Sequence, residues 1–231
     1  MNLFYQPLIP EGILYLDSDE SKHCIKVLRK ISGDELTITD GKGNFYDAII
    51  TKADPRQCAF EILSKTIESV RNYNIHIAIS PTKNSDRIEW FVEKAVELGV
   101  DTISFIACKN TERPYLKLER LEKVAVSAMK QSLKASIPVL QGLVNVSDVI
   151  KKSEEDFKFI AYVDHSNPDQ LKNLIKPASS YITLIGPEGD FTSSELDLAL
   201  AHGFQKVSLG TSRLRTETAG LAACHTLNLF Q

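Results

Sequence analysis

The sequence predicts an α/β protein in which a small, mainly β domain precedes a larger domain built on a parallel sheet. Two observations support this prediction. Short β-prone runs separated by turn signals continue to about Val70, and strand and helix patterns alternate from Ile75 onward. Strands that alternate with helices are typical of a parallel sheet covered on both faces. We therefore expect one domain over residues 1–71 and another over 72–231.

In the first domain, glycine, proline and aspartate turns separate the β-prone runs. One helical piece, residues 20–29, interrupts them. Several short strands in so short a segment indicate a small barrel, because closure removes exposed sheet edges. The β-prone runs are residues 13–16, 35–40, 45–51 and 58–67.

In the second domain, the polar residues 71–74 read as a linker, and apolar runs then alternate with amphipathic stretches. Ligand sites of such sheets form at the carboxyl ends of the strands. The expected strands are residues 75–80, 103–107, 157–163, 181–185 and 206–209. The expected helices are residues 85–98, 117–134, 169–175, 193–201 and 217–230.

The composition is ordinary for a soluble globular protein, with 43% hydrophobic and 25% charged residues. No apolar run is long enough to cross a bilayer, and residues 1–10 do not resemble a signal peptide. We therefore expect a cytoplasmic protein that does not contact a membrane. The cysteines are far apart and form no CxxC pair, so we expect free thiols and no metal site. They are Cys24, Cys58, Cys108 and Cys224.

Basic residues are concentrated between Lys109 and Lys134, although the net charge of the chain is −3. On a helix over residues 117–134, Lys123, Lys130 and Lys134 would share one face. A solvated helix face is the simpler interpretation of such a charge run. An RNA-binding face becomes the better one only if other residues also indicate a polyanionic ligand.

Two loops that follow expected strands are candidate binding sites. In residues 184–191 (LIGPEGDF), a strand leads through two glycines into a helix, and Thr192 with Glu195 has the spacing of a capping box. Gly186 and Gly189 allow close approach of backbone to a ligand or a positive φ. An ordinary strand-to-helix turn is the alternative. The loop lacks the features of a P-loop or a dinucleotide fingerprint.

Residues 209–219 (LGTSRLRTETA) form the second loop, which leads into the last expected helix. Thr216 can cap that helix. Arg213 and Arg215 beside a helix N-terminus make an anion site plausible. A capped helix with two solvated arginines fits the same residues equally well.

Together the two loops resemble the GPEG and LGxxxLRTETA signatures of SPOUT-class methyltransferases. More narrowly, the chain resembles the RsmE family, which methylates N3 of a uridine in small-subunit (16S) ribosomal RNA. The resemblance extends over nearly the whole chain in the same order and spacing. It includes His23 with the VLR segment 27–29, EKAVELGV at 93–100, TER at 111–113 and QS at 131–132.

The chain departs from the family pattern at a few positions. Asp190 stands where the family has the last glycine of GPEGG, and Lys134 stands where an arginine is usual. Lysine keeps the charge of arginine but loses its planar fork. The helix that contains Gln131 also lacks a tryptophan that family members often carry. These departures affect the expected RNA contacts more than the expected cofactor site.

The resemblance implies a C-terminal domain with a trefoil knot, a PUA-like RNA-binding barrel before it, and a homodimer with the knots at the interface. It also implies S-adenosylmethionine as methyl donor, held in the knot largely by backbone groups. The implied cofactor-binding residues are Leu184, Gly186, Glu188, Gly189, Leu209, Gly210, Ser212 and Leu214.

Transfer of the methyl group to a uracil nitrogen requires removal of the N3 proton or stabilisation of the uracil anion. Arg215 could stabilise that anion or bind a phosphate. Glu217 could serve as base, could orient Arg215, or could be only a helix-dipole partner. Arg113, in the Thr-Glu-Arg loop, is a third catalytic candidate.

The expected partner is ribosomal RNA, within the small subunit. His23 could contact RNA, but packing against the barrel is the preferred interpretation for this residue. Two alternatives remain: a SPOUT enzyme acting on another RNA position such as a ribose 2′-hydroxyl, and a catalytically idle dimeric RNA-binding protein. The candidate RNA-binding residues are Lys26, Arg29, Lys123, Lys130 and Lys134.

Overall fold

The computed structural model describes residues 2–69, 71–112, 115–162, 169–177 and 180–230. The chain divides into two compact units. The first comprises Met1–Val70 and Val126–Ile137, and the second Arg71–Ala125 and Pro138–Gln231. Residues 126–137, predicted to belong to the second domain, thus join the N-terminal unit. No helix among the described residues is long and apolar enough to cross a membrane.

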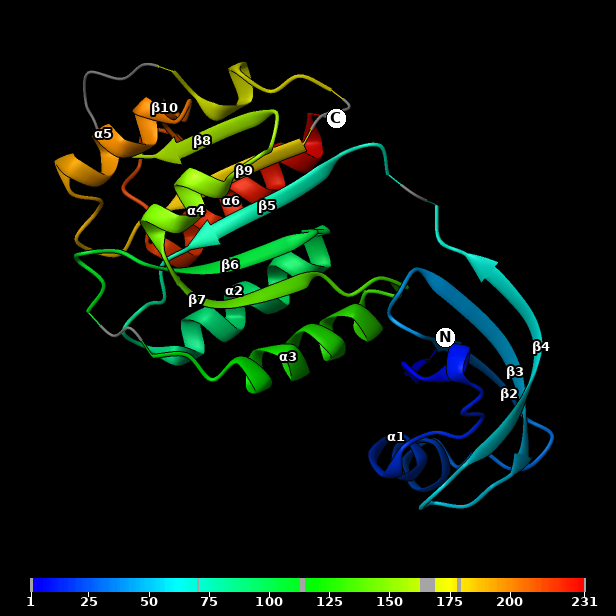
Figure 1. Ribbon diagram of the computed structural model, residues 1–231. Coiled ribbons are helices and arrows are strands. Elements are labelled where there is room, and N and C mark those ends of the chain that lie inside the picture. The colour runs from blue at the N-terminus through cyan, green and yellow to red at the C-terminus, as the bar shows by residue number, and fades with distance from the viewer. Residues whose placement is uncertain (1, 70, 113–114, 163–168, 178–179, 231) are drawn as a thin grey trace. The chain divides into compact units, whose positions relative to one another are not determined.

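The first unit is a small β domain, as predicted (Figure 1). Its strands are β1 (Leu3–Tyr5), β2 (Glu35–Thr39), β3 (Asn44–Lys52) and β4 (Ala59–Ile67), in the order β1-β2-β3-β4. β1 runs parallel to β2, and the other pairs are antiparallel. Alternate residues of the strands point inward, so Phe4, Ile38, Ile50 and Phe60 form a buried core.

Residues 14–16 connect the two edges of this sheet. The Leu16 N–H donates to Cys58 O (2.9 Å), and the Phe60 N–H donates to Leu14 O (3.0 Å). On the other side, the amide of Gln6, which follows β1, donates to Tyr15 O. The expected strand over residues 13–16 is therefore a short bridging segment, and it brings the edges of β1 and β4 together.

The helical piece of the first unit is α1 (Ser18–Lys22), which continues as the π-helical turn η2 (His23–Val27). Asp17 caps α1 by accepting from the N–H groups of Asp19 and Glu20. The chain leaves the helix through Arg29, whose φ of 56° lies in the left-handed region. The predicted helix over residues 20–29 is thus present but begins two residues earlier. A 3-10 turn, η1 (Ile9–Glu11), precedes it.

The turn between β2 and β3 binds residues 135–137. Gly41, at φ 75°, accepts from the Ile137 N–H (3.0 Å), and the Gly43 N–H donates to Ala135 O (3.0 Å). A Cβ on Gly41 would lie 2.9 Å from side-chain atoms of Ile137 and Tyr5. Only glycine therefore fits at this position, which places residues 135–137 against the sheet of the first unit.

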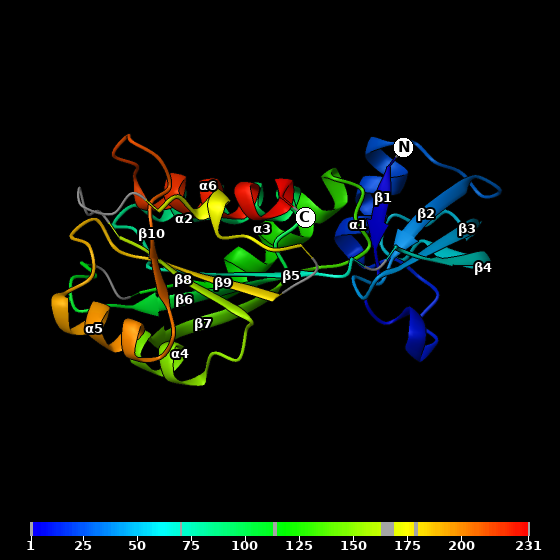
Figure 2. The ribbon, with the colours of Figure 1, turned by 90° about the horizontal axis from the view of Figure 1, so that it is seen from above.

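The second unit has a six-stranded, all-parallel sheet in the order β10-β8-β9-β5-β6-β7. α2 (Ser85–Leu98) and α6 (Thr216–Leu229) cover one face, and α4 (Val146–Lys152) and α5 (Ser193–Ala201) cover the other (Figure 2). The predicted parallel sheet is therefore confirmed. The strands are β5 (Asn74–Ile79), β6 (Thr102–Ala107), β7 (Val139–Asn145), β8 (Phe157–Ala161), β9 (Ser180–Ile185) and β10 (Gln205–Val207).

The strand order reverses beside β5. The chain passes from β5 to β6 and β7 on one side, returns to β8, and then inserts β9 between β8 and β5. After the edge strand β10, α6 returns to pack on β5, β9 and α2. Ligand sites of open parallel sheets form where the strand order reverses. A ligand site is therefore expected at the carboxyl ends of β5 and β9.

Several elements differ from the sequence predictions. β1, β7 and α4 were not predicted, and the expected helix over residues 169–175 is only a 3-10 turn, η3 (Leu171–Asn173). α3 (Leu118–Gln131) ends before Lys134, because Leu133 adopts a φ of 55°. The prediction that Lys134 shares a helical face with Lys123 and Lys130 is therefore wrong.

Residues 71–74 are not a free linker. The Arg71 guanidinium donates to Gly99 O (2.7 Å) and to Asn228 Oδ1 (3.2 Å), and it pairs with Asp101 Oδ1 (2.6 Å). One side chain thus connects the start of β5, the end of α2 and the end of α6 within the second unit.

Candidate functional site

Three loops meet at the carboxyl ends of β5, β6 and β9, because β5 pairs with both of the other strands. The Ser80 N–H donates to Ile185 O (3.0 Å), and the Ser80 hydroxyl lies 2.9 Å from Thr111 Oγ1. The Lys109 N–H donates to Glu195 Oε1 (2.8 Å) in the first turn of α5. These bonds connect the loop after β6 to β9 and α5.

The loop after β9 is fixed by Asn110. Its Nδ2 donates to the carbonyls of Gly189 (3.1 Å) and Asp190 (3.0 Å). The predicted capping box is confirmed: the Glu195 N–H donates to Thr192 Oγ1, and the Thr192 N–H donates to Glu195 Oε2. Asn110 was not predicted as a site residue, although it lies directly before the Thr-Glu-Arg segment.

Asp190 has a φ of 59°, in the left-handed region that favours glycine. Aspartate tolerates this conformation better than most residues because its short side chain bonds to nearby backbone. Here Asp190 Oδ1 accepts from the Phe191 N–H (2.8 Å). The departure from the family glycine is therefore compatible with the same turn.

The glycines of this loop serve close packing. Neither Gly186 nor Gly189 has a positive φ. A Cβ on Gly186 would lie 3.0 Å from the Phe191 ring, and a Cβ on Gly189 would lie 3.2 Å from Asn110 Cβ. The expectation of a positive φ is therefore wrong for both glycines, and the expected close approach of their backbone to a ligand stays a prediction.

The two motif loops are joined by a hydrogen bond from Thr216 Oγ1 to Gly186 O (3.1 Å). Thr216 does not cap α6 as expected. It is the first residue of the helix, and Arg215 occupies the N-cap position without a side-chain cap. The buried hydroxyl instead connects the start of α6 to the loop after β9.

Glu217, in the first turn of α6, is buried with 6% of its surface exposed. Its Oε1 lies 3.7 Å from Nε of Arg87, in the first turn of α2. Its Oε2 is buried and has no hydrogen-bond partner among the described residues. The ion-pair partner of Glu217 is thus Arg87 and not Arg215. Arg87 was not predicted as a site residue. In the sequence it is marked only as a basic residue in the first turn of the helix that follows β5.

The remaining predicted site residues differ in exposure. Leu184 is fully buried among core residues and lies within β9, where it pairs with Ala78 and Ile160. Glu188, Gly210, Ser212 and Arg215 are exposed, whereas Leu209 and Leu214 are half-buried. Gly210 has a φ of 126°, and the loop there is stabilised by a bond from the Ser208 hydroxyl to Gly210 O (3.0 Å). Arg113 lies outside the described residues.

A hollow of about 530 Å³ lies where the loops after β5, β6 and β9 meet. We call it the Arg87 hollow. It brings Glu188 of the first motif loop together with the first turn of α2. Its lining residues are Lys83, Asn84, Ser85, Arg87, Glu112 and Glu188.

The predicted RNA-binding residues fall into two groups. Lys26, Arg29 and Lys123 are exposed. Lys130 forms an ion pair with Glu20, in which both side chains are mostly buried, and Lys134 is half-buried beyond the end of α3. The exposed residues are therefore the better placed for phosphate contacts. The His23 ring is exposed but lies 6.2 Å from the Phe4 ring.

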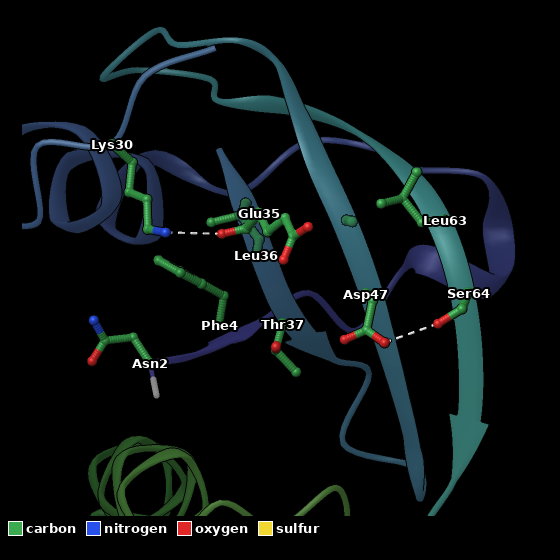
Figure 3. Close-up of a pocket in the computed structure, with 10 residues that line it drawn as sticks. Asn2, Phe4, Lys30, Glu35, Leu36, Thr37, Asp47, Leu63 and Ser64 are labelled. Atoms are coloured by element: carbon green, nitrogen blue, oxygen red, sulfur yellow. Dashed lines mark hydrogen bonds between the residues drawn. The ribbon is translucent and has the colours of Figure 1, made fainter. Parts of the chain in front are cut away.

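The first unit has its own hollow of about 590 Å³ on the β1–β4 sheet (Figure 3). Glu35 and Asp47 contribute carboxylates to it, and the one lysine among its lining residues, Lys30, donates to Glu35 O (2.9 Å). Two carboxylates beside one engaged ammonium make a poor phosphate site.

The four cysteines are buried free thiols, as expected. Burial raises the pKa of Cys24 and of Cys108 to about 12, so these thiols are unreactive near neutral pH. Among the described residues, no three His, Cys, Asp or Glu side chains are grouped so that they could hold a metal ion.

The chain is similar to known proteins over nearly its whole length. Residues 69–228 match the sequence model of the RNA methyltransferase domain family, and residues 16–63 match that of the RNA methyltransferase PUA domain. The ribosomal RNA small subunit methyltransferase E of Aquifex aeolicus (strain VF5) is 29% identical, with 95% of each chain covered.

Solved structures agree with this similarity. The crystal structure of a "probable rRNA-methyltransferase" from Porphyromonas gingivalis is 45% identical, covers 99% of each chain and has a TM-score of 0.93. The ribosomal RNA small subunit methyltransferase E of Neisseria gonorrhoeae, bound to S-adenosyl methionine, is 28% identical. It covers 97% of this chain and 95% of its own, with a TM-score of 0.85. This chain belongs to the RNA methyltransferase family, and within it to the RsmE family.

Proposed function

We propose that this chain transfers a methyl group from S-adenosylmethionine to N3 of a uridine in small-subunit ribosomal RNA. The observation that carries the proposal is the bond between Thr216 and Gly186, which joins the two signature loops in a chain of this family. The relatives from Aquifex aeolicus and Neisseria gonorrhoeae are named as ribosomal RNA small subunit methyltransferases, and the second was solved with S-adenosyl methionine.

The residues present fit the donor. Adenine needs amide donors and acceptors more than charges. The loop after β9 offers backbone at Gly186 and Gly189, where a Cβ would press on Phe191 and Asn110, and the loop after β10 offers backbone at Gly210. We propose that these two loops form the donor site. The proposed donor-site residues are Leu184, Gly186, Glu188, Gly189, Leu209, Gly210, Ser212 and Leu214.

The bound donor supplies an electrophilic methyl group on a sulfonium. The protein must then align the acceptor nitrogen with that methyl and favour loss of the N3 proton. Arg215, exposed at the N-cap of α6, is proposed to contact the RNA near the reacting base. Glu217 is proposed to act through Arg87, which it contacts. Arg113 remains a catalytic candidate from its position in the sequence.

RNA binding is proposed to use Lys26 and Arg29 of the first unit together with Lys123, Lys130 and Lys134. All five are basic and, with the exception of Lys130 and Lys134, exposed. We also propose that the PUA-like domain is the first unit, whose N-terminal segment ends next to the predicted boundary at residue 71. We further propose that α6 belongs to a trefoil knot and that the protein acts in the cytoplasm.

A homodimer is proposed on the face formed by α2 and α6, which pack together. Trp90 is 45% exposed on α2, and Leu229 and Phe230 at the end of α6 are 64% and 47% exposed. Large exposed apolar side chains on neighbouring elements are typical of a subunit interface.

The test is transfer of labelled methyl groups to unmodified small ribosomal subunits and to naked rRNA, followed by nucleoside analysis. Label in N3-methyluridine is the expected result. Label in a 2′-O-methyl nucleoside would move the enzyme to another SPOUT activity. Absence of donor binding in calorimetry would favour an idle RNA-binding protein. A bulky residue at Gly189 should displace the Asn110 side chain and abolish donor binding.

A further inference from the structure

We propose that the Arg87 hollow receives the acceptor base, and that Arg87, held by Glu217, stabilises the negative charge on uracil when N3 loses its proton. This inference rests on the proposed function and assigns its acceptor site. Arg87 would contact the reacting base directly, and Glu217 would be its positioning residue.

The first observation is the placement of Arg87 between a buried carboxylate and open space. Its side chain is 37% exposed and lines the hollow, while its Nε lies 3.7 Å from Glu217 Oε1. Glu217 lies in α6 directly after Thr216, which donates to Gly186 O in the loop after β9, one of the two proposed donor-site loops. Two consecutive residues of α6 thus contact that loop and Arg87.

The second observation is the unused bonding capacity of the pair. A guanidinium carries five N–H donors, and in the described residues Glu217 is the ion-pair partner of Arg87. Glu217 Oε2 is buried without a partner. The N–H groups of Arg87 that do not face Glu217 can therefore donate to acceptor atoms of a ligand in the hollow that Arg87 lines.

The third observation is the charge around the hollow. The charged groups that face Arg87 are Lys83 from the loop after β5, Glu112 from the loop after β6, Glu188 from the loop after β9, and Glu217 from α6. Lys83 is engaged by Glu112 (3.1 Å), and its N–H lies 3.5 Å from Glu188 Oε1. Three carboxylates against two cations disfavour a phosphate group. A neutral base that becomes anionic only beside Arg87 fits this balance.

The chemistry of uracil suits a guanidinium. When N3 loses its proton to solvent, the negative charge is shared with the two neighbouring carbonyl oxygens. Arg87 can donate N–H groups to one of these oxygens, and such charge-assisted bonds strengthen as the charge develops. The N3–CH₃ bond then forms as the S–CH₃ bond breaks, and the sulfur keeps the electron pair as a neutral thioether.

Arg87→Gln is the main test variant, with Arg87→Lys as the conservative one. Removal of one preorganised donor to a developing oxyanion costs about 100-fold in rate. We expect kcat/KM at neutral pH to fall by about that factor in Arg87→Gln. The pH at which the rate reaches its plateau should rise by about two units, because each unit corresponds to a tenfold change. In Arg87→Lys, which keeps the charge, kcat/KM should fall less than in Arg87→Gln.

Lys94→Gln is the matched control, because Lys94 is a cation on the same helix that pairs only with Glu93 and Glu97 in the described residues. It should leave the rate and the pH profile unchanged. Donor affinity, measured by calorimetry, should be unchanged in all variants. Fluorescence of Trp90, the single tryptophan of the chain, should confirm that α2 remains folded.

A more acidic acceptor separates charge stabilisation from a structural role. 5-Fluorouridine ionises more readily at N3 than uridine, and it can be introduced through small subunits reconstituted with rRNA that contains it. With this substrate, the ratio of kcat/KM between wild type and Arg87→Gln should shrink at least tenfold. An unchanged difference, or a wild-type pH profile in Arg87→Gln, would overturn the proposal. Loss of donor binding in Arg87→Gln would instead assign Arg87 to the donor site. Absence of transfer by the wild type would refute the proposed function itself.

Discussion

Gly220 is the position where the packing of α6 makes the strongest quantitative prediction. A Cβ there would lie 2.6 Å from Phe91 Cε2 and 2.9 Å from Ile79 Cδ1. Both neighbours are fully buried, so neither side chain can move aside into solvent. Gly220 therefore allows α6 to approach α2 and β5 closely.

Two opposing effects determine the result of Gly220→Ala. Alanine is favoured over glycine in a helix interior by about 1 kcal/mol. Overpacking a well-filled core costs about 1–3 kcal/mol, and the short contacts here place the cost near the upper limit. We therefore expect a net loss of about 2 kcal/mol, in the direction opposite to helix propensity.

The assay is urea unfolding followed by Trp90 fluorescence, which reports on α2. With an m value of about 2 kcal/mol/M, the loss corresponds to a midpoint lower by about 1 M. The exposed position His225 of α6 provides the control: replacement by Ala should give a more stable protein than replacement by Gly. Phe91→Leu should relieve the clash with Ala at position 220. The double variant should therefore lose less free energy of unfolding than the two single variants lose in sum. A Gly220→Ala protein more stable than wild type would refute the reasoning.

Three further predictions concern the loops and the sheet. Asp190→Val places a β-branched residue at φ 59° and should lower the free energy of unfolding by about 1–2 kcal/mol, whereas Asp190→Asn should change it little in the same urea titration. Asn110→Ala removes two bonds to the donor loop and should weaken donor binding about tenfold in calorimetry; unchanged affinity would exclude a positioning role for this side chain. Burial by itself raises the pKa of the Glu155 carboxyl, but hydrogen bonds from His76 and from backbone N–H groups outweigh it, so the net pKa lies below the ordinary 4.5. The resulting stability is present above pH 4.5 and is lost as the pH falls through the lowered pKa, so the melting temperature of Glu155→Gln should fall less steeply in acid than that of wild type.

Much of the second unit could be predicted from sequence because its strands are short apolar runs ended by recognisable loops. The segments 75–80, 103–107 and 181–185 all became strands of one parallel sheet. β7 was missed because its residues alternate only weakly in burial and include Gly142 and Gln141. α4 was missed because it has only seven residues and follows β7 directly.

The candidate site was likewise predictable only in part. Its glycines and the Thr192 capping box could be read locally, because each depends on neighbours a few residues away. The ion pair of Glu217 with Arg87 and the hydrogen bond of Asn110 to Gly189 O join residues about 80 to 130 positions apart. No local pattern encodes such contacts; they follow from the insertion of β9 beside β5 and the return of α6 across the sheet.

Residues 126–137 have a consequence for synthesis of the protein. The sheet of the first unit bonds to Ala135 and Ile137, which are made more than sixty residues after β4 ends. Because chains emerge from the ribosome at about 5–20 residues per second, the amino-terminal unit must wait several seconds for its last segment. By then β5, β6 and all of α3 have also been made. The first unit therefore cannot be completed until much of the second unit has been synthesised, and a fragment cut after residue 70 would lack residues 135–137, which bond to its sheet.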